Sequence, residues 1–291
     1  MQHHLENEFL AASFREKGAE LCSLRHKKWG TEYIWEGNPR IWGRHAPILF
    51  PIVGRLKDNQ YYYNNKPYQM SQHGFARDMD WQAVEETSDS ITFELNSSAE
   101  TQENFPFHWQ LHIYYQLTST SLITRYQVKH NGKEEEMYFS IGGHPAFCCP
   151  LEANLHFNDY FLEFEQTESA SRQHLTGGLR NGKTEKVLSN NTKLPLTVEL
   201  FNDDALIFSD LNSNKVSLKS DSGERGLHFH FNNFPYLGIW SKAGGAPFVC
   251  IEPWYGIADT ESGQHGLPEK EGILKLRPGQ TFSCQYQIEV F

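Results

Sequence analysis

This sequence of 291 residues lacks the features that mark nucleic-acid-binding and membrane proteins. Lysines and arginines form no cluster, and the formal net charge is −10, so the chain has no basic surface for nucleic acid. No stretch approaches the roughly 18 uncharged apolar residues of a membrane-spanning helix. The start, Met1-Gln-His-His, has neither the basic nor the apolar region of a signal peptide. We expect a soluble, cytoplasmic protein with no nucleic-acid or membrane partner.

Cysteine is scarce, and common catalytic motifs are absent. The five cysteines have no C-x-x-C or zinc-ligand spacing, so we expect reduced thiols rather than a disulfide framework or a structural metal; they are Cys22, Cys148, Cys149, Cys250 and Cys284. The sequence contains no H-E-x-x-H motif, no G-x-S-x-G nucleophile elbow and no glycine-rich nucleotide loop. These absences disfavour a catalytic metal and a nucleotide cofactor.

Aromatic residues, in contrast, make up 14% of the chain, which favours strands. Short segments in which apolar and polar residues alternate predict strands with one buried face. The clearest segments are residues 90–95, 109–117, 121–128, 160–164, 216–218, 227–231 and 283–290. Turn signals such as Asn131-Gly132 and Pro278-Gly279 separate them.

Helical periodicity is nearly absent, and only residues 16–24 and a short turn near Ala205 resemble helix. Many closely spaced strands without helices predict an all-β, antiparallel sandwich or barrel. No low-complexity linker divides the chain, so we expect a single domain over residues 1–291. The polar residues 167–193 are interpreted as a long loop or insertion.

Two ionisable residues stand in unusually apolar or rigid surroundings. Glu252 follows a run that is typical of a buried strand, and desolvation would make its carboxylate a stronger base. A glutamate satisfied by an arginine or by backbone N–H groups is the alternative. His144 lies between two glycines and Pro145, which would hold its imidazole rigidly. It could donate a proton, or it could be a hydrogen-bonded histidine at the end of a strand.

A second group of polar side chains could converge on one ligand. His73 and Arg77 share a loop, and Arg55 ends the apolar segment before it. Guanidinium groups suit hydroxyl or phosphate oxygens, but the two arginines could equally pair with Asp58, Asp78 or Asp80. Two histidines and a glutamate also permit a metal site, although their spacing gives it little support.

Seven ordered motifs identify a resemblance over the whole chain. They are Gly18-Ala19-Glu20-Leu21, Tyr33-Ile34-Trp35, Leu49-Phe50-Pro51-Ile52-Val53-Gly54-Arg55, Gln72-His73-Gly74-Phe75-Ala76-Arg77, Gly143-His144-Pro145-Ala146-Phe147, Gly238-Ile239-Trp240 and Cys250-Ile251-Glu252-Pro253-Trp254. Together they resemble the aldose 1-epimerase (galactose mutarotase) family, most closely its LacX-like branch. The resemblance implies one large antiparallel β-sandwich, the galactose mutarotase-like supersandwich, with a sugar in an open cleft.

The resemblance also implies roles for individual residues. Glu252 matches the family's general base and His144 its general acid, while Arg55 and His73 match residues that bind the sugar and stabilise the transition state. Asp204 best matches the sugar-binding aspartate, with Asp203 as the alternative. Arg77, as part of the same loop as His73, is a further candidate for substrate binding.

The resemblance implies an isomerase that interconverts the α and β anomers of an aldohexose without a cofactor or metal. Its only expected partner is the small-molecule sugar, and the sequence indicates no particular oligomeric state. Two alternatives stay open. The His73–Arg77 motif is also similar to the hexose-6-phosphate 1-epimerase branch, and a non-catalytic carbohydrate-binding protein could use the same cleft.

Overall fold

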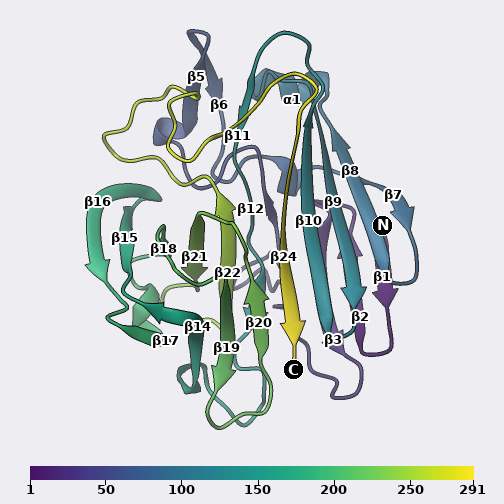
Figure 1. Ribbon diagram of the computed structural model, residues 1–291, viewed down its shortest axis with the longest axis vertical. Coiled ribbons are helices and arrows are strands. Elements are labelled where there is room, and N and C mark those ends of the chain that lie inside the picture. The colour runs from purple at the N-terminus through teal and green to yellow at the C-terminus, as the bar shows by residue number, and fades with distance from the viewer.

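The computed structural model describes residues 1–291, and almost all of its regular structure is β (Figure 1). Two large antiparallel sheets dominate. The first has nine strands, in the spatial order β17 (Asn191–Pro195), β14 (Tyr160–Glu168), β19 (Lys215–Ser220), β20 (Leu227–His230), β24 (Thr281–Val290), β10 (Ser121–His130), β9 (Trp109–Thr118), β8 (Ser90–Asn96) and β7 (Gln82–Glu86). The expectation of an all-β, antiparallel β-sandwich is confirmed.

The second large sheet has eight strands and carries most of the candidate site. Its order is β16 (Leu179–Lys186), β15 (Ser171–Thr176), β18 (Leu206–Phe208), β21 (Tyr236–Trp240), β22 (Phe248–Tyr255), β12 (Ile141–Gly143) and β4 (Ile48–Leu49), while β13 (Ala146–Cys148) also pairs with β22. Strand β22 therefore lies well inside the sheet, with β21 on one side and both β12 and β13 on the other.

Smaller elements complete the fold. The short sheets are β1 (Gln2–Glu6), β2 (Leu10–Arg15) and β3 (Glu20–His26); β5 (Gln60–Tyr63) with β6 (Lys66–Gln69); and β11 (Met137–Phe139) with β23 (Leu274–Leu276). The helices are α1 (Ala99–Asn104) and four 3₁₀ turns, η1 (Lys57–Asn59), η2 (Ala76–Asp78), η3 (Phe157–Asp159) and η4 (Glu199–Phe201). None of the helices has the length and apolar character needed to cross a membrane.

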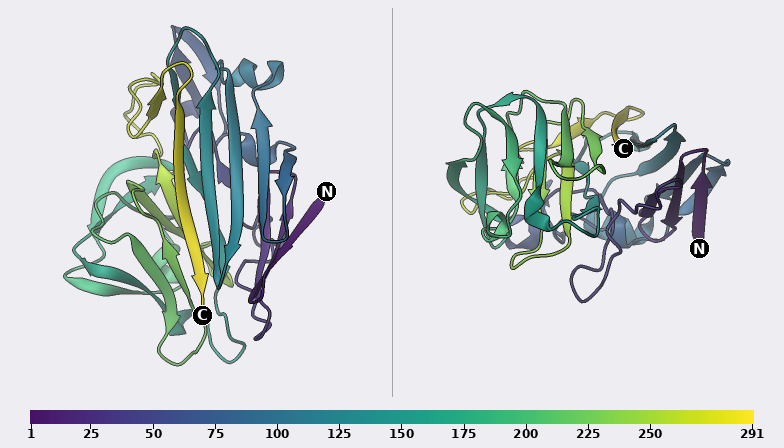
Figure 2. Two further views of the ribbon diagram at one scale, coloured as in Figure 1. Left: turned by 45° about the vertical axis from the view of Figure 1, so that its right-hand side comes forward. Right: turned by 90° about the horizontal axis from the view of Figure 1, so that it is seen from below.

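Aromatic side chains fill the core between the two large sheets. Phe147 of β13 contacts Phe229 of β20, with ring centroids 5.9 Å apart, and Phe164 of β14 meets Phe208 of β18 at 6.2 Å. The N-terminal sheet packs on the other end of the nine-stranded sheet, where Phe14 of β2 lies 4.6 Å from the ring of Tyr115 of β9 (Figure 2). The high aromatic content thus serves mainly to build the core.

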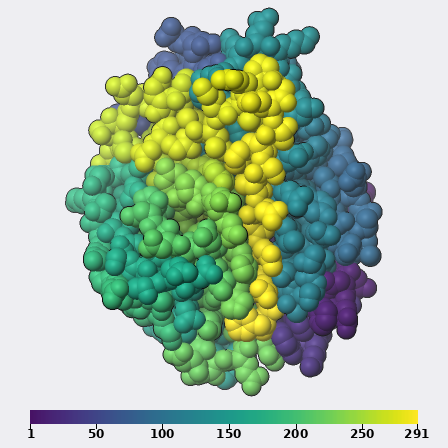
Figure 3. Space-filling view, in the orientation of Figure 1, coloured from purple at the N-terminus to yellow at the C-terminus, as the bar shows by residue number.

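Alternation of buried and exposed residues follows the predicted period of two. Along β9 the odd-numbered residues from Trp109 to Leu117 are buried, and the even-numbered ones lie nearer the solvent. Strand β24 shows the same alternation and forms part of one outer face of the molecule (Figure 3). The sheet therefore has one face in the core and one face toward solvent, as its sequence indicates.

Two local expectations were wrong. Residues 167–193 are not a long loop, because they contain β15, β16 and the start of β17. The β15–β16 hairpin turns at Gly177-Gly178, where both glycines have positive φ. Residues 16–24 are a turn followed by β3, not a helix. Gly18 and Ala19 both have positive φ there, which a helix cannot accommodate.

The loop that carries His73 depends on a close backbone contact at Gly74. Gly74 has φ +72°, and a Cβ added there would lie 2.2 Å from the carbonyl oxygen of Phe50.

We expect Gly74→Ala to lower the free energy of unfolding in urea by more than about 3 kcal/mol, since backbone strain and a backbone clash combine. Gly177→Ala is the matched control. Its φ is +58° with no atom within 4 Å of the added Cβ, so it should cost only about 1 kcal/mol. Equal losses in the two variants would contradict this account.

Candidate active site

The alternation of β22 directs Glu252 away from the main core. Val249 and Ile251 of this strand belong to the main core between the sheets, whereas Cys250 and Trp254 pack in two small clusters on the opposite face. Glu252 lies between Cys250 and Trp254 in the two-residue repeat, so it shares their face. Only 1% of Glu252 is exposed. The two-residue period of the strand therefore places the buried Glu252 carboxylate on the face of the sheet opposite the main core.

Strand register brings His144 opposite Glu252. On one side of His144, Gly142 pairs with Trp254, and on the other side Ala146 pairs with Cys250. A Cβ at Gly142 would lie 2.7 Å from the Trp254 side chain, so glycine is required for this close pairing. The motif around His144 thus fixes its position across from Glu252.

The two side chains form a close, buried pair. Nε2 of His144 lies 3.2 Å from Oε2 of Glu252. Burial, together with the nearby charge of Asp204, raises the pKa of Glu252 well above its usual value. Burial and the positive charge of Arg77 lower the pKa of His144 to about 3. Because burial disfavours charge on both groups, we expect the pair to hold a single proton at neutral pH.

Asp204, rather than Asp203, lies at the same cavity. Asp204 follows η4, has φ +71°, and accepts a hydrogen bond from the Ala205 N–H at 2.9 Å. Asp203 instead pairs with Arg172 at 3.2 Å. The two alternatives are therefore separated by geometry, and Asp204 is the aspartate available to a ligand.

His73 is held as a neutral hydrogen-bond donor. Its Nδ1 accepts a hydrogen bond from the Gly54 N–H at 3.2 Å, so the proton of the neutral ring is on Nε2. Burial and the neighbouring His144 keep its pKa well below the usual value. His73 also has φ +67°, in a loop tied to Phe50 and Gly54 by backbone hydrogen bonds. In the free protein the side-chain amide of Gln72 lies 3.2 Å from this Nε2, so a sugar oxygen would have to replace the Gln72 amide to accept a hydrogen bond from His73.

These side chains meet in one cavity of about 310 Å³. Its lining combines charged, polar and aromatic groups, namely Trp42, Arg44, Gly54, Gln72, His73, Arg77, His144, Leu175, Gly178, Asp204, Ala205, Ile207, Trp240, Glu252, Trp254 and Ala258. Acid and base groups, hydrogen-bonding side chains and indole rings in one hollow suit a polyhydroxylated ring with apolar C–H faces.

Arg77 lines the cavity, but Arg55 does not. Nη1 of Arg55 donates to the carbonyl oxygen of Gly177 at 2.8 Å, and its Nε donates to Asn59. The neighbouring Gly54 does line the cavity, so the chain passes the site while the Arg55 side chain turns to the β15–β16 hairpin. The Arg55 side chain thus does not line the cavity but supports the wall formed by Gly178, and its contact with the sugar stays a prediction.

Residues 36–46 contribute two side chains that the sequence analysis missed. The Trp42 ring stacks near His144, with centroids 5.1 Å apart and an interplanar angle of 27°, and Trp240 approaches His144 edge-on at 5.7 Å. Arg44 also lines the cavity. The sequence did contain an indication of this loop's role, because glycines such as Gly37 and Gly43 and nearby prolines interrupt it, as they interrupt the motifs around His73 and His144.

The five cysteines are all free. Cys250 is fully buried, and its sulfur lies with the ligand atoms of His144 and Glu252 inside a group spanning at most 4.8 Å, which could hold a metal ion. Burial and the nearby Glu252 raise the pKa of the Cys250 thiol well above its usual value. A metal ion would have to displace the thiol proton of Cys250. The three side chains therefore suit an acid and base pair better than a metal centre.

Comparison with known proteins agrees with the architecture. Residues 1–265 match the family model of aldose 1-epimerase. The chromosomal protein LacX of Lactococcus lactis subsp. lactis is 34% identical over 298 residues, covering 100% of this chain and 99% of LacX. A galactose mutarotase related enzyme from Lactobacillus acidophilus superimposes with a TM-score of 0.95 at 34% identity, covering 100% of this chain and 97% of that one. A galactose mutarotase-like protein from Lactobacillus casei gives 0.93 at 34% identity, with both chains fully covered.

Fold and cavity together define a galactose mutarotase-like β-sandwich with a buried carboxylate and imidazole in its cleft. The chain belongs to the aldose 1-epimerase family.

Proposed function

We propose that this protein is an aldose 1-epimerase, an isomerase that interconverts the α and β anomers of an aldohexose without a cofactor. The observation that carries the proposal is the buried His144–Glu252 pair, whose facing atoms lie 3.2 Å apart in a cavity of about 310 Å³. The reaction needs a base at the anomeric hydroxyl and an acid at the ring oxygen, and these two oxygens are attached to the same carbon. A base and an acid in contact satisfy that requirement.

A single shared proton supplies both functions. When it resides on His144, Glu252 is a carboxylate and His144 an imidazolium. Glu252 then removes the proton of the anomeric hydroxyl while His144 protonates the ring oxygen. The bond between the anomeric carbon and the ring oxygen breaks, and the carbonyl double bond of the open aldehyde forms.

Reclosure completes the exchange. Rotation about the bond beside the aldehyde presents its other face to the hydroxyl formed from the ring oxygen. His144 takes the proton of that hydroxyl as it attacks, and Glu252 returns its proton to the carbonyl oxygen. The opposite anomer results, and the pair regains its starting protonation. Donation from His73 and acceptance by Asp204 would hold the sugar while the bond rotates.

Polarimetry of freshly dissolved α-anomers tests the proposal. We expect the purified protein to speed the approach to anomeric equilibrium above the buffer rate for at least one aldose, including aldose phosphates, and to do so equally in a chelator. Saturable sugar binding without any acceleration would instead support a non-catalytic carbohydrate-binding protein. Loss of activity in the chelator, restored by a metal, would favour the His144, Cys250 and Glu252 metal group.

The pH profile gives an independent test of Glu252 as the base. The active form carries one proton on the pair, and burial and Asp204 raise the pKa at which Glu252 releases a proton well above the ordinary value of 4.5. As pH rises through this raised pKa, the pair loses its only proton and no acid remains for the ring oxygen, so kcat/KM, which reports the free enzyme, should decline. Asp204→Asn removes one cause of the shift and should move this decline to lower pH. A pH profile that Asp204→Asn leaves unchanged would contradict the assignment.

A further inference from the structure

The indole ring of Trp254 extends across β22 on the face of the sheet that carries Glu252. The two residues are two positions apart on this strand, and both line the cavity. A Cβ added at Gly142 of β12 would lie 2.7 Å from Cδ1 of Trp254. A Cβ added at Gly238 of β21 would lie 2.6 Å from its Cζ2 and 3.2 Å from its Cε2. The ring therefore reaches from one neighbouring strand to the other.

This placement brings the N–H edge of the ring to Glu252. Nε1 of the indole is bonded to Cδ1 and Cε2, so it lies between the contacts with Gly142 and Gly238. Gly238 is the residue of β21 that pairs with Glu252. The indole N–H and the Glu252 carboxylate therefore share one face and one level of the sheet.

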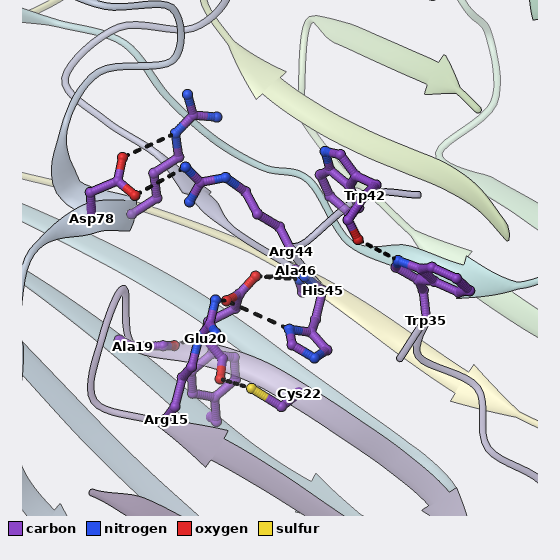
Figure 4. A network of polar contacts seen from close by, with 12 residues as sticks. Arg15, Ala19, Glu20, Cys22, Trp35, Trp42, Arg44, His45, Ala46 and Asp78 are labelled. Carbon is purple, nitrogen blue, oxygen red and sulfur yellow. Dashed lines mark hydrogen bonds and ion pairs between the residues drawn. The ribbon is translucent and has the colours of Figure 1, made fainter. Parts of the chain in front are cut away.

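Both groups are buried and lack a hydrogen-bond partner. Trp254 is 4% exposed, and neither its Nε1 nor Oε2 of Glu252 takes part in a hydrogen bond; the contact of Oε2 with His144 is close but is not aligned as one. A buried indole N–H usually finds an acceptor. Nε1 of Trp35, for example, donates to the carbonyl oxygen of Trp42 at 2.9 Å (Figure 4). The free donor of Trp254 and the free acceptor of Glu252 complement each other.

An indole N–H favours one protonation state of the neighbouring carboxyl group. It can donate but cannot accept, so it stabilises a carboxylate more than a protonated carboxyl group. Burial and the charge of Asp204 raise the pKa of Glu252, whereas the Trp254 indole N–H lowers it. Ring opening begins from the form in which Glu252 is ionised and the shared proton is on His144. The indole donor therefore favours the form that reacts.

We propose that Trp254 is a positioning residue whose indole N–H donates to the Glu252 carboxylate and thereby increases the fraction of the pair in which the shared proton is on His144. Trp254 exchanges no proton with the sugar. It acts through Glu252, which it holds ionised and fixed in direction. The effect on turnover rests on the proposed function, but the hydrogen bond between the two side chains does not.

Trp254→Phe tests the kinetic consequence, because it keeps an aromatic ring and removes the donor. We expect kcat for anomer exchange to fall by about 10-fold, while KM changes by only a few-fold. Without the donor the carboxylate is less stable, so the decline of kcat/KM at high pH should move to higher pH by about 1–2 units. Asp204→Asn should move the same decline to lower pH, so the two variants give opposite shifts.

Trp109→Phe is the matched control. Trp109 is 1% exposed, and its Nε1 is also buried without a hydrogen-bond partner, but it belongs to the main core and does not line the cavity. Its substitution should lower the melting temperature through lost packing and leave the pH of the decline unchanged. The same pH shift in both variants would show a general effect of packing and overturn the role of Trp254.

The NMR signal of the Trp254 indole proton tests the hydrogen bond without any sugar. Through-bond correlations assign the signal, so the measurement does not depend on a variant of Trp254. We expect the signal to move downfield as pH rises and Glu252 becomes ionised. In Glu252→Gln the signal should not change over the same pH range.

The outcomes distinguish this inference from the proposed function. An active protein in which Trp254→Phe changes neither kcat nor the pH of the decline overturns the inference and leaves the epimerase intact. If no sugar is turned over, the indole signal still decides. A titration that disappears in Glu252→Gln supports the hydrogen bond, and a signal that is independent of pH in the unmodified protein overturns it.

Discussion

Glu252→Gln is expected to lower kcat for anomer exchange by about 10²–10⁴-fold, the typical contribution of one positioned proton transfer. The amide has nearly the shape of the carboxyl group but cannot accept the proton of the anomeric hydroxyl. Because Glu252 is only 1% exposed and its charge is disfavoured by burial, the neutral amide should not weaken the fold. Sugar affinity, measured by calorimetry, should change by only a few-fold.

The protein contains a matched control for this variant. Glu94 and His112 form another carboxylate–imidazole pair, 2.8 Å apart, on strands β8 and β9 and outside the cavity. Glu94→Gln should leave kcat unchanged. If Glu252→Gln keeps full turnover, or if both substitutions reduce it equally, Glu252 is not the base.

His144→Gln should lower kcat by a similar factor of about 10²–10⁴, because the ring oxygen loses its proton donor. Removing the imidazole also leaves the Glu252 carboxyl without the partner that lies 3.2 Å away. The pair acts as a unit, so the double variant should be little slower than either single variant. The measurement is kcat for the two single variants and the double variant.

His112→Gln is the corresponding control and should retain full activity, since its pair lies outside the cavity. Fully additive losses in the Glu252 and His144 variants would show two independent roles. That result would contradict a shared proton.

Much of the fold could be predicted because strand periodicity is a local property. The alternating residues 109–117 and 121–128 correspond closely to β9 and β10, which end at Thr118 and His130. The β15–β16 hairpin was missed because its residues are mostly polar and do not alternate in burial. Its strands are held by pairing with each other and by the contact of β15 with β18. Strand pairing of this kind produces no alternation of apolar and polar residues in the sequence, although Gly177-Gly178 does indicate a turn.

In the candidate site, too, residues on strands were easier to predict than residues in loops. Residues carried by strands, such as Glu252, or set by strand register, such as His144, could be predicted because the backbone fixes their direction. Side chains in irregular loops could be predicted only in part, since His73, Arg77 and Asp204 line the cavity but Arg55 does not. Arg55 and Gly54 are adjacent, yet only Gly54 lines the cavity. Arg44 reaches the cavity through the hydrogen bonds of Glu20, a partner 24 residues earlier that no local pattern reveals.

The most direct test of the central claim is exchange of magnetisation between the α and β anomeric protons of an equilibrated aldose or aldose phosphate. The unmodified protein should produce exchange above the buffer rate, and Glu252→Gln should abolish the enhancement while the sugar still binds. Absence of exchange above buffer for every sugar, or undiminished exchange in Glu252→Gln, would contradict a ring-opening reaction driven by the Glu252 and His144 pair.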